Sequence, residues 1–165
     1  MSCIATFYVL PDNQHAAFLS SKQREPRVEN RKVLFFTRRK QIAGEQIWEF
    51  LDRVAAKKVD LELSGFLLVD YLFVYLGIKA DEYFQRLDDN YSALMPDGAE
   101  ELTAFLAARH VDRVAIDRYL KDDGRPLAES ERDDTLNAYE TAHSKLAEWC
   151  ASVRPGTFGV LHLSF

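Results

Sequence analysis

Glycine and cysteine are scarce in this chain, and their scarcity excludes several kinds of site. Only seven glycines and two cysteines occur among its 165 residues. The glycines form neither a GxGxxG nor a GxxxxGK phosphate loop, and the motifs GxSxG and HExxH are missing as well. Two isolated cysteines fall short of a four-ligand structural zinc site. The sequence therefore predicts no cofactor, no metal site and no catalytic constellation, and it does not favour an enzyme.

Long apolar runs are also missing. Residues 66–78 carry a single charge, on Asp70, but a membrane-spanning helix needs about 20 residues, so this segment is expected to be a buried central helix. There is no cationic and apolar leader at the start. With 47% hydrophobic residues, the chain is expected to be one cytoplasmic domain over 1–165, with no membrane partner.

The net charge of −5 is unevenly distributed along the chain. Residues 21–40 contain eight basic and two acidic residues, a balance of +6, which leaves −11 for the rest. This basic segment, 20–40, is predicted to be a loop that moves, with 32–37 either a short strand or an apolar patch. Basic residues beside Phe35 and Phe36 suit single-stranded nucleic acid, but a solvated loop is the simpler interpretation. A general nucleic-acid binder needs a wider positive surface.

The hydrophobic pattern predicts an α+β fold that is mostly helical. Strands are expected at 3–10, 59–63 and 157–165, and the two terminal strands should pair at the centre of a small sheet. Asp12, Ser64, Asp97 and Ser130 are candidate helix N-caps. Helical spacing predicts helices, several of which cover the sheet, at 12–19, 44–55, 66–78, 80–87, 98–110, 111–120 (with a strand at 114–116 as the alternative) and 130–153.

Asp70 is the most informative single residue. An unpaired carboxylate is costly to bury, so Asp70 must meet water, a cation or a helix N-terminus. If it faces a cleft beside Tyr71 and Tyr75, it is a candidate ligand, partner or acid–base group. The alternative is a structural ion pair or a set of structural hydrogen bonds.

Cys150 and His143 share one face of the predicted helix at 130–153. A thiolate–imidazole pair would be a nucleophile, but two helical turns separate the two residues by about 10 Å. We therefore expect a buried thiol and a core or boundary histidine with its hydrogen bonds satisfied. A disulfide between Cys3 and Cys150 is geometrically conceivable, although a cytoplasmic setting keeps both cysteines reduced.

Three segments resemble a known group of proteins: MSCIATFYVL at 1–10, IWEFLD at 47–52 and LSGF at 63–66. They are similar to small uncharacterised bacterial proteins that open with a Met-Ser-Cys-Ile strand, and through them to the YfbM-like family of unknown function. Ile47 and Trp48 stand where an aromatic pair is expected. The resemblance implies a bacterial cytosolic α+β domain and supplies no activity and no functional residues.

Three hypotheses for function follow. The first is a non-enzymatic interaction protein whose acidic surface meets a cationic protein, as an immunity protein or antitoxin does; ordinary solubility charge is the simpler explanation of that acidity. The second is a small-molecule binder or enzyme with a pocket near Asp70, Tyr71 and Tyr75. The third is a self-associating structural domain, that is, a homo-oligomer.

Overall fold

The computed structural model describes residues 4–21, 27–33, 36–42, 46–87 and 90–164. Its strands are β1 (Ile4–Pro11), β2 (Arg27–Val33), β3 (Phe36–Ile42), β4 (Lys57–Ser64), β5 (Phe84–Arg86), β6 (Tyr91–Leu94) and β7 (Thr157–Ser164). Its helices are η1 (Asp12–Gln14), α1 (His15–Ser21), α2 (Ile47–Val54), α3 (Gly65–Val69), η2 (Asp70–Tyr75), α4 (Ala80–Tyr83), α5 (Pro96–Ala107), α6 (Arg113–Asp122) and α7 (Glu129–Ser152). η1 is a 3₁₀ helix and η2 a π-helix.

The main sheet has five antiparallel strands in the order β4-β1-β7-β6-β5. β1 and β7 run side by side from Ile4 opposite Ser164 to Pro11 opposite Thr157. The prediction that the two terminal strands pair at the centre of a small sheet is therefore confirmed, as is the α+β fold. The predicted strand at 59–63 is the middle of β4, on the other side of β1.

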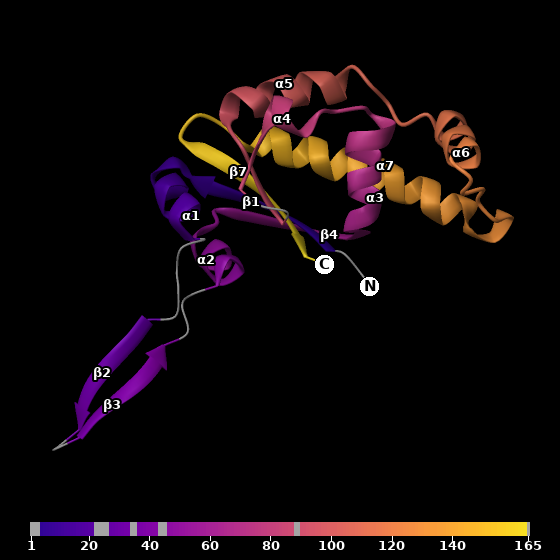
Figure 1. The fold of residues 1–165 in the computed structure, drawn as a ribbon. Helices are drawn as coiled ribbons and strands as arrows, with labels where there is room; N and C mark the ends of the chain where they lie inside the picture. The colour runs from indigo at the N-terminus through magenta and orange to yellow at the C-terminus, as the bar shows by residue number, and fades with distance from the viewer. Residues whose placement is uncertain (1–3, 22–26, 34–35, 43–45, 88–89, 165) are drawn as a thin grey trace.

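Helices cover both faces of this sheet (Figure 1). Successive side chains of a strand point to opposite faces. Phe7 and Val9 of β1 accordingly join a core cluster with α3, η2, α5 and α7, whereas Tyr8 and Leu10 join a second cluster with α1 and α2. The apolar run at the start of the sequence is thus explained by burial of β1 on both sides.

Trp149 of α7 fixes this long helix on the sheet. Its ring is fully buried and stacks on Phe7 at 4.6 Å between centroids, while its Nε1 donates a hydrogen bond to the carbonyl oxygen of Tyr8 at 2.8 Å. Gly159 of β7 leaves the space for the ring, because a Cβ at that position would lie 2.6 Å from Trp149 Cζ2. The predicted helix at 130–153 and its apolar stripe are confirmed.

The predicted central helix at 66–78 is confirmed in position, but its second half is a π-helix. The backbone N–H of Leu76 donates to the carbonyl of Tyr71 at 2.9 Å, five residues back. Such wide turns occur frequently at functional sites. Here the turn brings Asp70 and Tyr71, which are consecutive in sequence, to residues four apart on α7, Tyr139 and His143.

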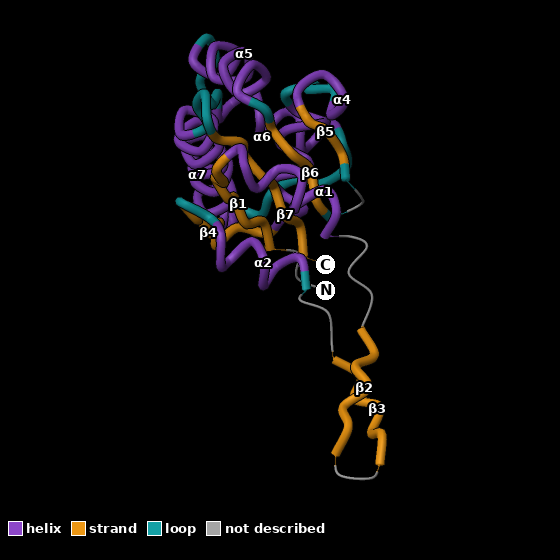
Figure 2. Tube along the Cα trace, turned by 90° about the vertical axis from the view of Figure 1, so that its left-hand side faces the viewer, coloured by secondary structure: helices purple, strands orange, loops and turns teal. Residues whose placement is uncertain are grey.

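The basic segment differs from its prediction. A loop was expected, but β2 and β3 form an antiparallel hairpin, a two-stranded sheet separate from the main one. Both views show this hairpin standing away from the body (Figures 1 and 2). Alternation of polar and apolar residues is weak in 27–33, so the pattern gave no strand signal there. The movement expected for 20–40 stays a prediction. Residues 22–26 and 34–35 lie outside the described part of the chain, and with them lie Phe35 and part of the segment 32–37.

The region 80–94 also differs from its prediction. The expected helix at 80–87 is only the short α4, followed directly by β5, and β6 was not predicted. Pairing between β5 and β6, and between β6 and β7, outweighs the local helical pattern. Strands of three and four residues are too short to give a periodic signal.

Helix starts were predicted less well than helices. Asp97 lies inside the first turn of α5, whose N-cap is Met95, and α7 begins after Ala128 rather than at Ser130. Asp12 is likewise the first residue of η1, not its cap. The predicted short helix at 111–120 is α6, capped by the side chain of Asp112.

Among the helices that the structure describes, none is long and apolar enough to cross a bilayer.

Candidate functional site

Asp70 begins η2 and faces α6 and α7. Its Oδ1 accepts hydrogen bonds from the Tyr119 hydroxyl and from Arg125 Nη2, both at 3.0 Å, and its Oδ2 accepts one from the Tyr139 hydroxyl at 2.8 Å. The side chain is 16% exposed. These four residues are called the Asp70 cluster below. The structural interpretation predicted an ion pair or hydrogen bonds for this carboxylate, and it has both.

The partners of Asp70 are held in their usual protonation states. Burial raises the pKa of Tyr139 and of Tyr119, and the hydrogen bond to the Asp70 carboxylate raises each further. Burial alone would lower the pKa of Arg125, but its hydrogen bonds to Asp70 and Asp123 raise it overall. Near neutral pH these groups therefore hold their protons rather than transfer them.

Tyr71 and His143 form a second, neutral pair. The Tyr71 hydroxyl lies 2.5 Å from His143 Nδ1, and the backbone carbonyl of Leu106 accepts a hydrogen bond from the same ring. We assign the ring proton to Nε2, so that it donates to Leu106 while Nδ1 accepts from the Tyr71 hydroxyl. Burial lowers the pKa of His143 and raises that of Tyr71. His143 is a partly buried histidine, and both of its ring nitrogens have a partner.

The three residues singled out from the sequence share η2 but not one set of partners. Tyr75 stacks on Tyr71 at 5.8 Å and contacts the ring of Tyr119 at 5.5 Å, both between centroids. The Asp70 carboxylate is bound by α6, α7 and Arg125, whereas the Tyr71 hydroxyl is bound by His143. A ligand or partner role for Asp70, Tyr71 and Tyr75 stays a prediction.

Cys150 lies beyond this region, on the last turns of α7. Its thiol is buried and free, and burial raises its pKa to about 12, so it is protonated at neutral pH. His143 is occupied by Tyr71. The expectation of a buried thiol is thus confirmed for Cys150, and His143 fits the expected histidine at the boundary of the core. Cys3 lies outside the described residues, so the Cys3–Cys150 pairing is not tested.

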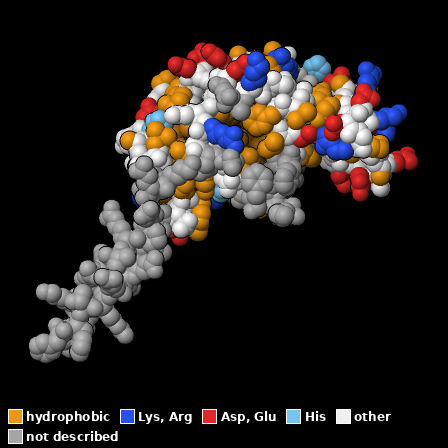
Figure 3. All heavy atoms as spheres, viewed as in Figure 1, with side chains coloured by type: hydrophobic (Ala, Val, Ile, Leu, Met, Phe, Trp, Pro, Cys, Tyr) orange, Lys and Arg blue, Asp and Glu red, His pale blue; other side chains and the backbone are white. Residues whose placement is uncertain are grey.

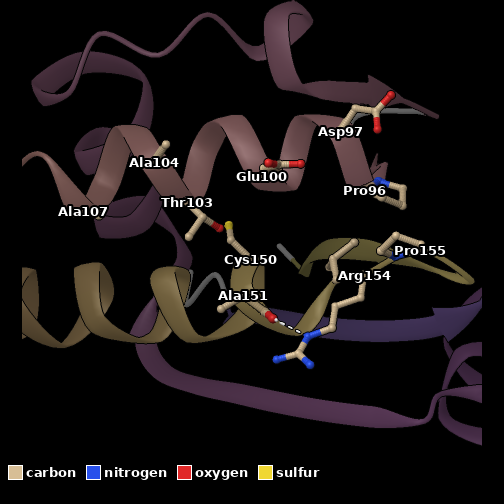
Figure 4. A pocket seen from close by; sticks show the side chains of 11 residues that line it. Pro96, Asp97, Glu100, Thr103, Ala104, Ala107, Cys150, Ala151, Arg154 and Pro155 are labelled. Atoms are coloured by element: carbon tan, nitrogen blue, oxygen red, sulfur yellow. Dashed lines mark hydrogen bonds between the residues drawn. The ribbon is translucent and has the colours of Figure 1, made fainter.

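A groove of about 530 Å³ runs between α5 and the end of α7 (Figure 4). Sequence reasoning did not identify it. Its walls are mainly small or apolar, with carboxylates near the start of α5 and a guanidinium on the α7 side. The residues that line it are Pro96, Asp97, Glu100, Thr103, Ala104, Ala107, Cys150, Ala151, Val153, Arg154 and Pro155.

Local sequence explains why α5 forms one wall of this groove. Pro96 is the first helical residue, where its missing N–H costs nothing. Gly98 allows α5 to approach the preceding segment closely, because a Cβ there would lie 2.9 Å from the carbonyl oxygen of Tyr83. Ala104 and Ala107, one and two turns after Glu100, have small side chains and so leave space on this side of the groove. A continuous small-residue face therefore lies open beside α7.

Charge in the α5–α7 groove is not balanced across its width. Asp97 and Glu100 are exposed, and neither has an ion-pair partner among the residues that the structure describes. Figure 3 shows acidic side chains gathered over the first half of α5. Arg154 points away from them: its Nε donates to the Ala151 carbonyl at 3.3 Å, as Figure 4 shows. Figure 4 shows the Asp97 side chain extending from α5 on the side away from α7, and neither carboxylate has a neutralising cation among the described residues.

The groove has the properties of a binding surface. The thiol at its floor is protonated, and the Thr103 hydroxyl donates to the Ala99 carbonyl at 2.6 Å. No group of three or more metal-ligating side chains is found within the described parts of the chain. For binding, the groove therefore offers the negative charges of Asp97 and Glu100 next to an apolar floor.

One signal in the sequence could have indicated the α5 wall. Asp97, Glu100, Ala104 and Ala107 recur at helical spacing, a stripe of acidic and small residues next to the buried face. The opposite wall comes from residues about fifty positions later, and only the packing of α5 on α7 brings the two together. No family model matches the chain, and no curated protein or solved structure is significantly similar to it. The resemblance to the YfbM-like family therefore stays a prediction.

Proposed function

We propose that the protein is a non-enzymatic interaction protein of the bacterial cytoplasm that binds a cationic segment of another protein in the α5–α7 groove. The observation that carries this proposal is the pair of unneutralised carboxylates, Asp97 and Glu100, beside a floor of small and apolar residues. A lysine or arginine suits both features. Its aliphatic stem lies on the apolar floor while its charged head reaches a carboxylate.

The dimensions of the groove support a short segment rather than a single small ion. Its volume of about 530 Å³ falls within the usual range for ligand sites, roughly 300–1,000 Å³. Lining residues on α5 extend from Pro96 to Ala107, which at the rise of an α-helix corresponds to about 16 Å. An extended chain of about five residues has the same length.

The overall charge distribution supports the same class of partner. The strands of the hairpin hold six basic residues and Glu29, a balance of +5, so the remainder of the chain carries −10. A negative body attracts a cationic protein over distances of about a Debye length and raises the association rate. A basic toxin is one partner of this kind, and the protein would then act as an immunity protein or antitoxin.

Binding of a defined peptide tests the proposal directly. The probe is a fluorescein-labelled nonapeptide of alternating lysine and leucine, titrated with the whole chain and followed by fluorescence anisotropy. The double variant Asp97→Lys/Glu100→Lys is expected to weaken binding about tenfold, since two exposed charge contacts are replaced by repulsion. A peptide with glutamate in place of lysine is expected not to bind.

A matched control separates the groove from general acidity. The variant Glu131→Lys/Asp134→Lys makes the same change in net charge at exposed positions near the start of α7. It is expected to retain binding within about twofold in 150 mM salt, where distant charges are screened. Equal weakening by the two double variants would contradict the proposal, because the peptide would then be responding to net charge alone.

A further inference from the structure

The β2–β3 hairpin lacks the features that would stabilise it alone. An isolated two-stranded hairpin is marginally stable at best in water. Its register places Arg31 opposite Arg38, a pairing of like charges, and only Glu29 opposite Lys40 pairs unlike charges. Six of its fourteen strand residues are basic. A hairpin of this composition gains stability from contact with an acidic surface.

The chain itself has such a surface in the α5–α7 groove, where Asp97 and Glu100 have no cationic partner among the described residues. The two surfaces are complementary in charge. About 16 Å of groove accommodates most of a seven-residue strand, which is about 23 Å long.

The hairpin lies outside the groove of its own chain. It is inserted between α1 and α2, which pack in the core cluster on one face of the sheet, whereas α5 and α7 pack in the cluster on the other. Figures 1 and 2 place the hairpin and α5 at opposite ends of the molecule. In this arrangement, a hairpin that occupied the groove would belong to another molecule.

We infer that the β2–β3 hairpin of one copy of this chain occupies the α5–α7 groove of a second copy, and that the exchange is reciprocal. The inference rests on the proposed function, because it names the occupant of the same groove. Hairpin and groove are different surfaces, so a single contact would propagate into an open chain. A two-fold dimer closes the assembly, with each hairpin in the partner's groove.

Sedimentation velocity on the full chain tests this inference. In 50 mM salt the wild type is expected to sediment as a species of twice the 19.0 kDa chain mass, and to dissociate progressively toward 500 mM salt as the charges are screened. The groove variant Asp97→Lys/Glu100→Lys and the hairpin variant Arg38→Glu/Arg39→Glu are each expected to raise the dimer dissociation constant at least about tenfold. Circular dichroism verifies that both variants are folded.

Mixing the two variants gives the most specific result. The groove variant still has a basic hairpin, and the hairpin variant still has an acidic groove. In an equimolar mixture, the basic hairpin of the groove variant meets the acidic groove of the hairpin variant, and the glutamates introduced in the hairpin meet the lysines introduced in the groove. The mixture is therefore expected to form a heterodimer with a lower dissociation constant than either variant alone. The control Glu131→Lys/Asp134→Lys is expected to dimerise as the wild type does. If the wild type dimerises but the mixed variants do not associate, the contact lies elsewhere and the inference is overturned.

The outcomes also separate this inference from the proposed function. A wild type that stays monomeric at 100 μM in 50 mM salt overturns the inference, while peptide binding that depends on Asp97 and Glu100 still supports the proposed function. A monomer whose hairpin variant loses affinity for a 20-base-pair DNA duplex would assign the hairpin to nucleic acid instead. If the peptide dissociates the wild-type dimer, both proposals are supported, because peptide and hairpin then compete for one groove.

Discussion

The Asp70 cluster and the α5–α7 groove both place carboxylates beside α7, but they treat these charges in opposite ways. Asp70 receives three hydrogen bonds, and Arg125 bridges it to Asp123 at 2.7 Å. Asp97 and Glu100, near the other end of α7, have no ion-pair partner within the described residues. A carboxylate whose partners all come from its own chain contributes to folding, whereas one left facing a cavity remains available to another molecule.

The surroundings of each region reinforce this difference. Near the Asp70 cluster, Arg113 bridges Asp133 and Glu140, and Arg132 lies 3.4 Å from Asp117. Figure 3 shows the resulting mixture of acidic and basic side chains over α6 and the start of α7. Over the start of α5 the same view shows acidic side chains gathered together. Mixed charge favours a stable surface, and charge of one sign favours recognition of an opposite charge.

Removal of the Asp70 carboxylate is expected to have the largest effect on stability. Asp70→Ala leaves the hydroxyls of Tyr119 and Tyr139 and the Arg125 guanidinium without their acceptor, and should lower the free energy of unfolding by about 3 kcal/mol. Urea denaturation measures this. Asp123→Ala, which removes only an exposed contact of Arg125, should cost less than about 1 kcal/mol. If a stable Asp70→Ala variant bound the peptide more weakly, the Asp70 cluster would take part in binding. That result would contradict the distinction between the two regions.

Filling the groove is expected to affect binding without affecting stability. Ala104 is exposed on the α5 wall, and Ala104→Phe places a ring in the groove that is proposed to bind the peptide. The lysine–leucine peptide should then bind roughly tenfold more weakly, about 1.4 kcal/mol. The urea midpoint should be almost unchanged. Ala108→Phe, also exposed on α5 but outside the groove lining, is the matched control, and binding that is equally weak in both variants would argue against the groove as the site.

Loss of the Tyr71 hydroxyl is expected to have an intermediate effect. Tyr71→Phe removes the donor to His143 Nδ1 inside the chain and should lower the free energy of unfolding by about 1 kcal/mol. The hydroxyl of Tyr75 has no hydrogen bond among the described residues, so Tyr75→Phe should change stability by less than about 0.5 kcal/mol. Thermal unfolding of both variants, side by side, gives the comparison. Equal losses would mean that ring packing, not the hydrogen bond, holds η2 on α7.

The pH dependence of stability is expected to show the smallest effect. Burial lowers the pKa of His143 in the folded protein below its usual 6.5, so the unfolded chain takes up a proton first as the pH falls. The contribution of His143 is complete above pH 6.5 and declines as the pH falls toward the lower folded pKa. Between pH 7.5 and pH 5 the urea midpoint of the wild type should decrease. The decrease over the same range should be smaller for His143→Gln. Parallel curves for the two proteins would show that other groups cause the decrease.

Long elements were predictable from the sequence because each buries a face with a clear period. β1, β7 and α7 agree with their predicted positions within a few residues. Short segments whose conformation depends on pairing with another strand were predicted wrongly. The helical pattern at 80–87 yields to strand pairing of β5 with β6, and the basic hairpin gains its two strands from pairing that no local pattern indicates.

The two sites also differ in how far the sequence could predict them. Asp70 was identified because a single charge in an apolar helix needs a partner, but its partners, Tyr119, Arg125 and Tyr139, are 49 to 69 residues away and could not be named. The groove was missed because neither wall contains an unusual residue. Asp97 and Glu100 look like ordinary exposed helix residues until the end of α7 is placed beside them.

The pairing of β1 with β7 has a consequence for the time at which the protein can fold. β1 hydrogen-bonds to a strand about 150 residues later, so the centre of the sheet cannot close until residues 157–164 have left the ribosome. At usual rates of translation the wait is roughly 8 to 30 s. During that interval Phe7 and Leu10, fully buried in the finished sheet, remain without their neighbours on β7. The nascent chain is therefore a natural substrate for chaperones that cover apolar strands.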